Sequence, residues 1–187
     1  MKTFLKWFAM PLLIAVIASA LYLVDAAIGG IFVEGGSFMW VGFAIWTIFY
    51  GASVKDRIKG LIGVVIGYVS AMVMMAITNS FTLNLGTISI SCLLGVFLIN
   101  GAVMMLDKTE KVWLNSITGV FAGIFLTFSG FGVSLSPLSS VSTAFTGLGI
   151  LMVYAALGML CGFFSIYGGA KIKTALASQP ETPKTEK

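Results

Sequence analysis

Histidine is absent from the 187 residues, and charged residues make up only 10% of them. Without histidine, the chain lacks the most common metal ligand and the side chain that most often moves protons near neutral pH. The sequence contains no Gly-Lys-Ser/Thr phosphate loop, and its serine and cysteine side chains have no histidine to activate them. We therefore expect a protein that is not an enzyme and holds no cofactor and no metal ion.

Charged residues are too few for a soluble protein. A soluble domain carries about 25% charged residues, whereas here hydrophobic residues account for 58% of the chain and gather in long runs. Cys92 and Cys161 both lie within such runs, where we expect buried free thiols rather than a disulfide. A fold of this size cannot hide so much apolar surface from water. The composition predicts an all-α protein that crosses a lipid bilayer several times.

Six apolar segments are candidates for transmembrane helices within a single domain of residues 1–169. They cover approximately residues 8–24, 38–52, 60–77, 85–106, 112–128 and 144–167. The first also resembles a signal peptide with a cleavage-like Ala18-Ser19-Ala20, but its apolar run continues to Val24, so we interpret it as a retained helix. The polar residues 170–187 are expected to form a disordered cytoplasmic tail.

Basic residues indicate how these six helices are oriented. If the helices alternate from a cytoplasmic N-terminus, all eleven Lys and Arg residues lie on the cytoplasmic side. The loops 25–37, 78–84 and 129–143, which would lie outside, contain none. This distribution follows the positive-inside rule and predicts that both termini are cytoplasmic. It also lacks the broad basic surface that nucleic acid requires, so the expected partner is the lipid bilayer.

One short pattern occurs twice without gaps. Ala44-Ile45-Trp46-x-x-Phe49-x-Gly51 matches Gly123-Ile124-Phe125-x-x-Phe128-x-Gly130. With three spans in each unit, the two halves would run in opposite directions, which is the inverted 3+3 repeat of many transporters. The alternative is chance similarity, because Phe, Ile and Gly are frequent throughout the chain.

Three pairs of glycines are spaced four residues apart, which places both members of a pair on one helix face. They are Gly63 and Gly67, Gly119 and Gly123, and Gly158 and Gly162. Faces without Cβ atoms allow two membrane helices to approach closely. We interpret them as contacts between helices of one chain, with a homo-oligomer as the alternative.

Polar residues within the predicted spans are neutral. Asp25 and Glu34 fall in the first outer loop, so we expect neither a proton relay nor a sodium site inside the membrane. The hypothesis for function is a pathway for a small neutral or weakly polar solute, with polar and aromatic lining residues. The proposed lining residues are Trp46, Phe49, Tyr50, Asn100, Asn115, Thr118, Phe125 and Phe128. The alternative for these residues is packing, hydrogen bonding between helices, or contact with lipid.

Several glycine and aromatic motifs resemble a known family. Trp40-Val41-Gly42-Phe43, Lys59-Gly60-Leu61 and Gly119-Val120-Phe121-Ala122-Gly123 are similar to those of the YcdZ-like family of small bacterial inner-membrane proteins. The resemblance implies a multi-pass protein of the bacterial inner membrane whose function is uncharacterised, and it assigns no site residues.

Together these patterns predict an uncoupled channel or facilitator for a small solute. The alternative function is a membrane scaffold or accessory subunit that binds a protein partner and transports nothing itself.

Overall fold

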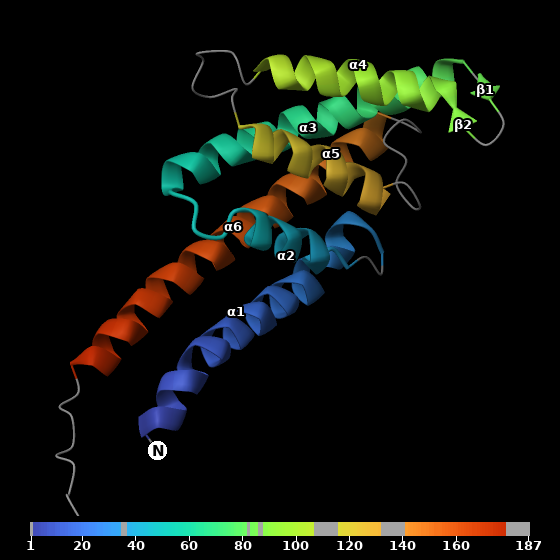
Figure 1. Cartoon of the computed structure of the whole chain (residues 1–187). Helices are drawn as coiled ribbons and strands as arrows, with labels where there is room; N and C mark the ends of the chain where they lie inside the picture. The colour runs from blue at the N-terminus through green and yellow to red at the C-terminus, as the bar shows by residue number, and fades with distance from the viewer. Residues whose placement is uncertain are drawn as a thin grey trace, which may run out of the picture.

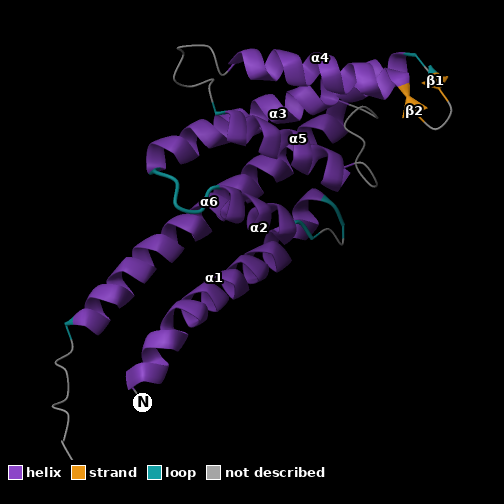
Figure 2. Cartoon of the chain, in the orientation of Figure 1, coloured by secondary structure: helices purple, strands orange, loops and turns teal. Residues whose placement is uncertain are grey.

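The computed structural model describes residues 2–34, 37–81, 83–85, 88–106, 116–131 and 141–178. Almost all of these residues are helical (Figure 2). The helices are α1 (Lys2–Phe32), α2 (Met39–Ile48), α3 (Val54–Ser80), α4 (Ile90–Leu106), α5 (Ile117–Phe131) and α6 (Val141–Ala177). A two-stranded antiparallel hairpin, β1 (Asn84–Leu85) and β2 (Ile88–Ser89), precedes α4.

Three helices are long and apolar enough to cross a membrane. These stretches are Phe8–Phe32 of α1, Val54–Ser80 of α3 and Ser142–Ala177 of α6. The described parts of α2, α4 and α5 are apolar but shorter. The prediction of an all-α protein is confirmed, and three of its helices have the length and apolar composition that a membrane span needs.

Both long terminal helices extend beyond their predicted ends. The first span was predicted to end at residue 24, but α1 continues through Asp25 to Phe32. The tail was predicted to be disordered from residue 170, but α6 continues to Ala177. The extended end of α1 contacts α6 through Tyr154, whose hydroxyl donates to Asp25 and whose ring centre lies 6.5 Å from that of Phe32. Near the end of α6, Gly168 and Gly169 lie against Leu13 and Met10 of α1. Tertiary packing therefore sustains helix where the sequence contains residues that break it.

The connection between α2 and α3 is a tight turn. Gly51 has a φ of +85°, a conformation that glycine adopts without steric cost. Ser53 then caps α3, because its hydroxyl accepts a hydrogen bond from the Asp56 main-chain N–H at 3.2 Å. The basic cluster of residues 55–59 therefore lies in the first turns of α3, although the sequence placed it in a loop before a span starting at residue 60.

The remaining boundaries also differ from the sequence prediction. The β1–β2 hairpin occupies the predicted start of the fourth span at residue 85, so α4 begins at Ile90. Helix α5 begins at Ile117 rather than near residue 112. The second span was predicted to reach residue 52, but α2 ends at Ile48.

The helices form two groups that meet at the centre of the molecule (Figure 1). Helix α3 packs against α5 and α4, whereas α6 packs against α2 and α1, and α3 also contacts α6. The main core lies at this meeting point, and Ile45, Val64, Leu126, Ile150 and Tyr154 are almost fully buried in it.

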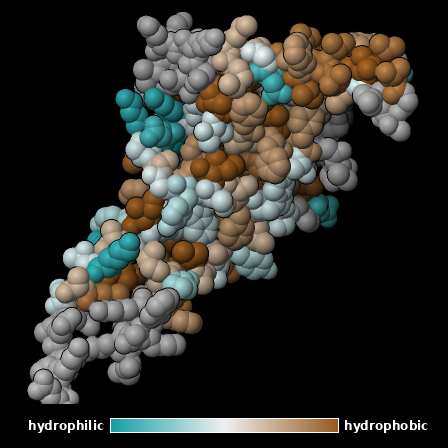
Figure 3. Space-filling model, viewed as in Figure 1, coloured by the Kyte–Doolittle hydropathy of each residue, from teal (hydrophilic) through white to brown (hydrophobic). Residues whose placement is uncertain are grey.

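The outer face of α4 is apolar and exposed. Leu93, Phe97 and Met105 are exposed there, and hydrophobic residues dominate the surface over α4 and the hairpin (Figure 3). Such a surface is stable in contact with lipid, whereas in water it would be an extended hydrophobic patch.

Candidate functional site

A cavity of about 470 Å³ opens between the end of α2, the start of α3 and the start of α5. Its lining residues are Ile48, Phe49, Ala52, Asp56, Lys59, Ser116, Ile117 and Thr118. The turn at Gly51 and the cap at Ser53 set the direction in which α3 leaves α2. They thereby place Asp56 and Lys59 opposite the first residues of α5.

The polar groups of this cavity are an acid, a base and two hydroxyls. Asp56 accepts a hydrogen bond from the Ser53 hydroxyl at 2.6 Å, while Lys59, Ser116 and Thr118 complete the polar wall. One carboxylate and one ammonium cancel in net charge. The wall therefore suits a solute without net charge that can both donate and accept hydrogen bonds.

Phe49 forms the apolar part of the same cavity. Its ring is 5% exposed and lies so close to Gly60 that a Cβ at residue 60 would collide with it. The glycine in the second turn of α3 therefore makes room for the aromatic side chain just after α2.

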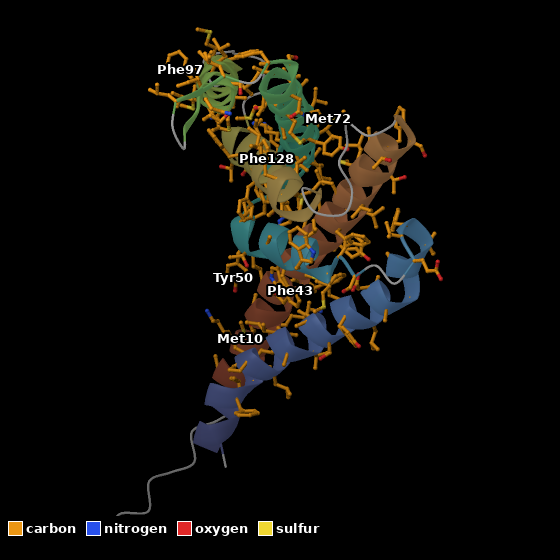
Figure 4. All side chains as sticks on the ribbon, turned by 90° about the vertical axis from the view of Figure 1, so that its right-hand side faces the viewer. Met10, Phe43, Tyr50, Met72, Phe97 and Phe128 are labelled. Carbon is orange, nitrogen blue, oxygen red and sulfur yellow. The ribbon has the colours of Figure 1, made fainter. Side chains whose placement is uncertain are left out.

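The predicted lining residues do not gather around one pathway. Phe49 and Thr118 share the cavity just described. Trp46 and Tyr50 instead line a second cavity of about 430 Å³ between α1 and α2, together with Phe43. Figure 4 shows Tyr50 and Phe128 well apart along the molecule.

The other predicted lining residues point away from the centre. Phe125 and Phe128 are exposed on α5, and Asn100 lines a shallow apolar groove on α4. The Asn100 side chain donates to Val96 O of its own helix at 2.8 Å, the ordinary solution for a polar side chain beside lipid. Asn115 lies outside the described residues.

The glycine pairs bring helices of the same chain together. Gly63 and Gly67 of α3 face Gly119 and Gly123 of α5 so closely that an added Cβ would meet main-chain atoms. Gly158 abuts Gly42 of α2, and Gly162 lies beside Trp46 and Arg57. The four glycines between α3 and α5 form one interface.

Asp25 corrects the expectation that no ionisable residue lies within the helices. It is only 3% exposed and sits inside the apolar stretch of α1. Its carboxylate accepts hydrogen bonds from the Ser37 hydroxyl at 2.6 Å, the Phe38 main-chain N–H at 2.9 Å and the Tyr154 hydroxyl at 2.5 Å. The apolar run that resumes after Asp25, as Ala-Ala-Ile, is the signal that could have placed it inside a helix.

Arg57 is a second buried ion that the sequence placed in an exposed turn. Its guanidinium donates to Met159 O of α6 at 2.5 Å and to Ala52 O at 3.1 Å. The guanidinium carbon also lies 5.9 Å from the centre of the Phe163 ring, a cation–π geometry. Arg57 therefore ties the start of α3 to the middle of α6. Within the described residues, no three His, Cys, Asp or Glu side chains gather as a metal site would require.

No protein-family model, curated protein or solved structure matches this chain. The described chain is helical, with three helices that are long and apolar enough to cross a membrane, a polar cavity between α2, α3 and α5, and a buried carboxylate between α1 and α6.

Proposed function

We propose that this chain is a six-span membrane protein that carries a small polar solute without net charge across the bacterial inner membrane. The observation that carries this proposal is the cavity between α2, α3 and α5. Its polar wall of Asp56, Lys59, Ser116 and Thr118 lies among helices that carry many exposed apolar side chains. A polar recess in an apolar helix bundle offers hydrogen bonds to a polar solute, and these replace the hydrogen bonds that the solute makes with water.

The direction of the helices supports six spans with cytoplasmic termini. The start of α1, the end of α6 and the turn between α2 and α3 lie on the same side of the molecule (Figure 1). The ends of α1 and α3 lie on the opposite side, and the end of α3 lies near the hairpin (Figure 1). Lys55, Lys59, Lys171 and Lys173 therefore lie towards one side, as the positive-inside rule requires.

The packing supports the inverted repeat. If α1–α3 exchanges with α4–α6, the pair α3 and α5 becomes α6 and α2, and the pair α3 and α4 becomes α6 and α1. These are the pairs that pack together. The tightest crossings correspond as well, since Gly67 abuts Val120 O and Gly158 abuts Gly42 O. This correspondence pairs Gly42 with Val120, one residue away from the register of the sequence pattern, which pairs it with Phe121.

Solute flux into reconstituted vesicles tests the transport proposal. We expect vesicles containing the protein to swell or take up label faster than empty vesicles for uncharged polar solutes, and more slowly for ions of similar size. Thr118→Leu should reduce this rate because it fills the cavity. Thr174→Leu is the matched control, because Thr174 is exposed near the end of α6. A rate equal to that of empty vesicles for every solute in the panel would refute the proposal.

The scaffold alternative has one surface in its favour, the groove of about 650 Å³ on the outer face of α4. Phe97 and Met105 line it and are exposed. Affinity purification in mild detergent separates the two functions. A stoichiometric partner that dissociates from the Phe97→Ser variant, combined with an absence of flux, would favour the scaffold.

A further inference from the structure

Asp25 is an acidic side chain inside an apolar membrane helix, and the proposed transport route does not use it. An ionisable residue in such a position is costly to maintain and usually has a function. Its three hydrogen-bond donors come from separate parts of the chain. Ser37 and Phe38 belong to the connection between α1 and α2, and Tyr154 belongs to α6. One carboxylate thus holds three segments together at the end of the molecule opposite the basic cluster.

No Lys or Arg in the described part of the chain forms an ion pair with Asp25. Tyr154 is the titratable group that faces it from α6. Helix α2 contributes no charged residue, and Glu34 is exposed. Among the described residues, the negative charge of the carboxylate is therefore balanced only by N–H and O–H dipoles. Binding of a proton removes this charge.

The same hydrogen-bond donors determine which ligands the Asp25 carboxylate can bind. Ser37, Phe38 and Tyr154 all direct hydrogen atoms at the carboxylate oxygens. A metal cation needs several oxygen lone pairs around it, and these hydrogens occupy the places where such a cation would sit. A proton needs only one carboxylate oxygen. Ser37 is exposed while Asp25 is buried, so the serine hydroxyl connects the carboxylate to the solvent from which a proton would come.

We propose that Asp25 is a proton-binding site that controls the closure of the outer end of the helix bundle. In the ionised state, three charge-assisted hydrogen bonds hold the α1–α2 connection and α6 against α1. Proton transfer from water to a carboxylate oxygen removes the negative charge, and hydrogen bonds to a neutral acid are roughly half as strong. The connection then separates from α6, and water enters between them. This proposal does not depend on transport activity.

The accessibility of an engineered thiol tests the proposal. Val41 of α2 is 1% exposed and lies in the same core cluster as Tyr154, so Val41→Cys reports opening at this end. The background carries Cys92→Ser and Cys161→Ala to remove the native thiols. The reaction rate with a water-soluble maleimide is measured between pH 3 and pH 8 in detergent. It is divided by the rate of Leu83→Cys, an exposed position, to correct for ionisation of the thiol.

We expect the rate ratio to be low near neutral pH and to rise only below about pH 4, because the donors favour the ionised carboxylate. The rise should be at least tenfold, which is about the change in an opening equilibrium when even one of the three hydrogen bonds loses its charge. Asp25→Asn is neutral at every pH and should keep the ratio high and flat. Tyr154→Phe and Ser37→Ala each remove one donor from the ionised form, so the transition should move to higher pH. These two variants retain the carboxylate and keep the test valid if Asp25→Asn does not fold.

Two results would overturn the proposal. One is a ratio that does not change with pH in the Val41→Cys protein. The other is an unchanged transition midpoint in both Tyr154→Phe and Ser37→Ala, which would mean that a different group titrates. A structural role alone would lower the thermal stability of these variants without moving any pH transition.

Discussion

Gly67 is the position where a single methyl group should do most damage to this fold. The Cβ of Gly67→Ala would collide with Val120 O and would lie 2.8 Å from Ile124 N and 2.9 Å from Gly123 Cα. All three are main-chain atoms of α5, so no side-chain rotation can relieve the contact. Helices α3 and α5 must move apart along the most extensive helix interface in the molecule.

The expected cost follows from two opposing terms. Overpacking of a close interface costs about 3 kcal/mol at the upper end of the usual range, which applies because both partners are backbone. Replacement of glycine by alanine within a helix stabilises the helix by about 1 kcal/mol. The net loss is therefore about 2 kcal/mol, which corresponds to a decrease in Tm of roughly 4–8 °C for a chain of this size.

Two other glycines provide matched controls for the same substitution. A Cβ at Gly101 of α4 meets nothing within 4 Å, and a Cβ at Gly95 of the same helix lies 3.3 Å from Met74 O. We expect Gly101→Ala to raise Tm slightly, Gly95→Ala to leave it nearly unchanged, and Gly67→Ala to lower it. The assay is thermal unfolding of the purified protein in detergent. A Gly67→Ala protein as stable as Gly101→Ala would refute the close α3–α5 approach.

Two further predictions concern a core hydrogen bond and the topology. Tyr68→Phe removes the hydroxyl that donates to Ala144 O at 2.7 Å, and it should lower the free energy of unfolding by about 1 kcal/mol; Tyr22→Phe, at an exposed position, should change it little. In a variant without native thiols, a membrane-impermeant thiol reagent applied to intact cells should label Leu85→Cys but not Lys59→Cys, and the reverse pattern would overturn the proposed orientation.

The sequence was informative wherever composition or a local pattern carries the signal. Fifty-eight per cent hydrophobic residues with no histidine indicated helices in lipid, and the described chain is helical with long apolar helices. Glycines spaced four residues apart indicated close packing because only their spacing matters on a helix face. Gly63, Gly67, Gly119 and Gly123 do lie at one interface.

The sequence was misleading at residues whose local preference conflicts with their tertiary contacts. Asp25 followed by Gly29 and Gly30 is typical of a loop, yet all three lie in α1. The partners that stabilise Asp25 include Tyr154, which is 129 residues away in sequence. Neither the helix nor the burial of its carboxylate could be predicted without that long-range contact.

The residues that were predicted to line one pathway do not lie together, and the physical reason is a different one. Aromatic residues occur on every face of these helices, so residue type alone does not tell whether a side chain faces the core, a cavity or lipid. Trp46 and Phe49 are buried, whereas Phe125 and Phe128, at the matching positions of the repeated pattern, are exposed. The packing partner of each helix determines this difference.

The sequence by itself indicated that lipid, rather than water, surrounds much of this protein, because the ratio of apolar to charged residues determines how much surface must avoid water. It also determined which helix faces can approach closely, because the positions of the glycines are a local property. Only the tertiary structure decided which helices pair, where the polar cavity opens and that Asp25 is buried. These outcomes depend on contacts between residues far apart in the chain, and no local pattern contains them.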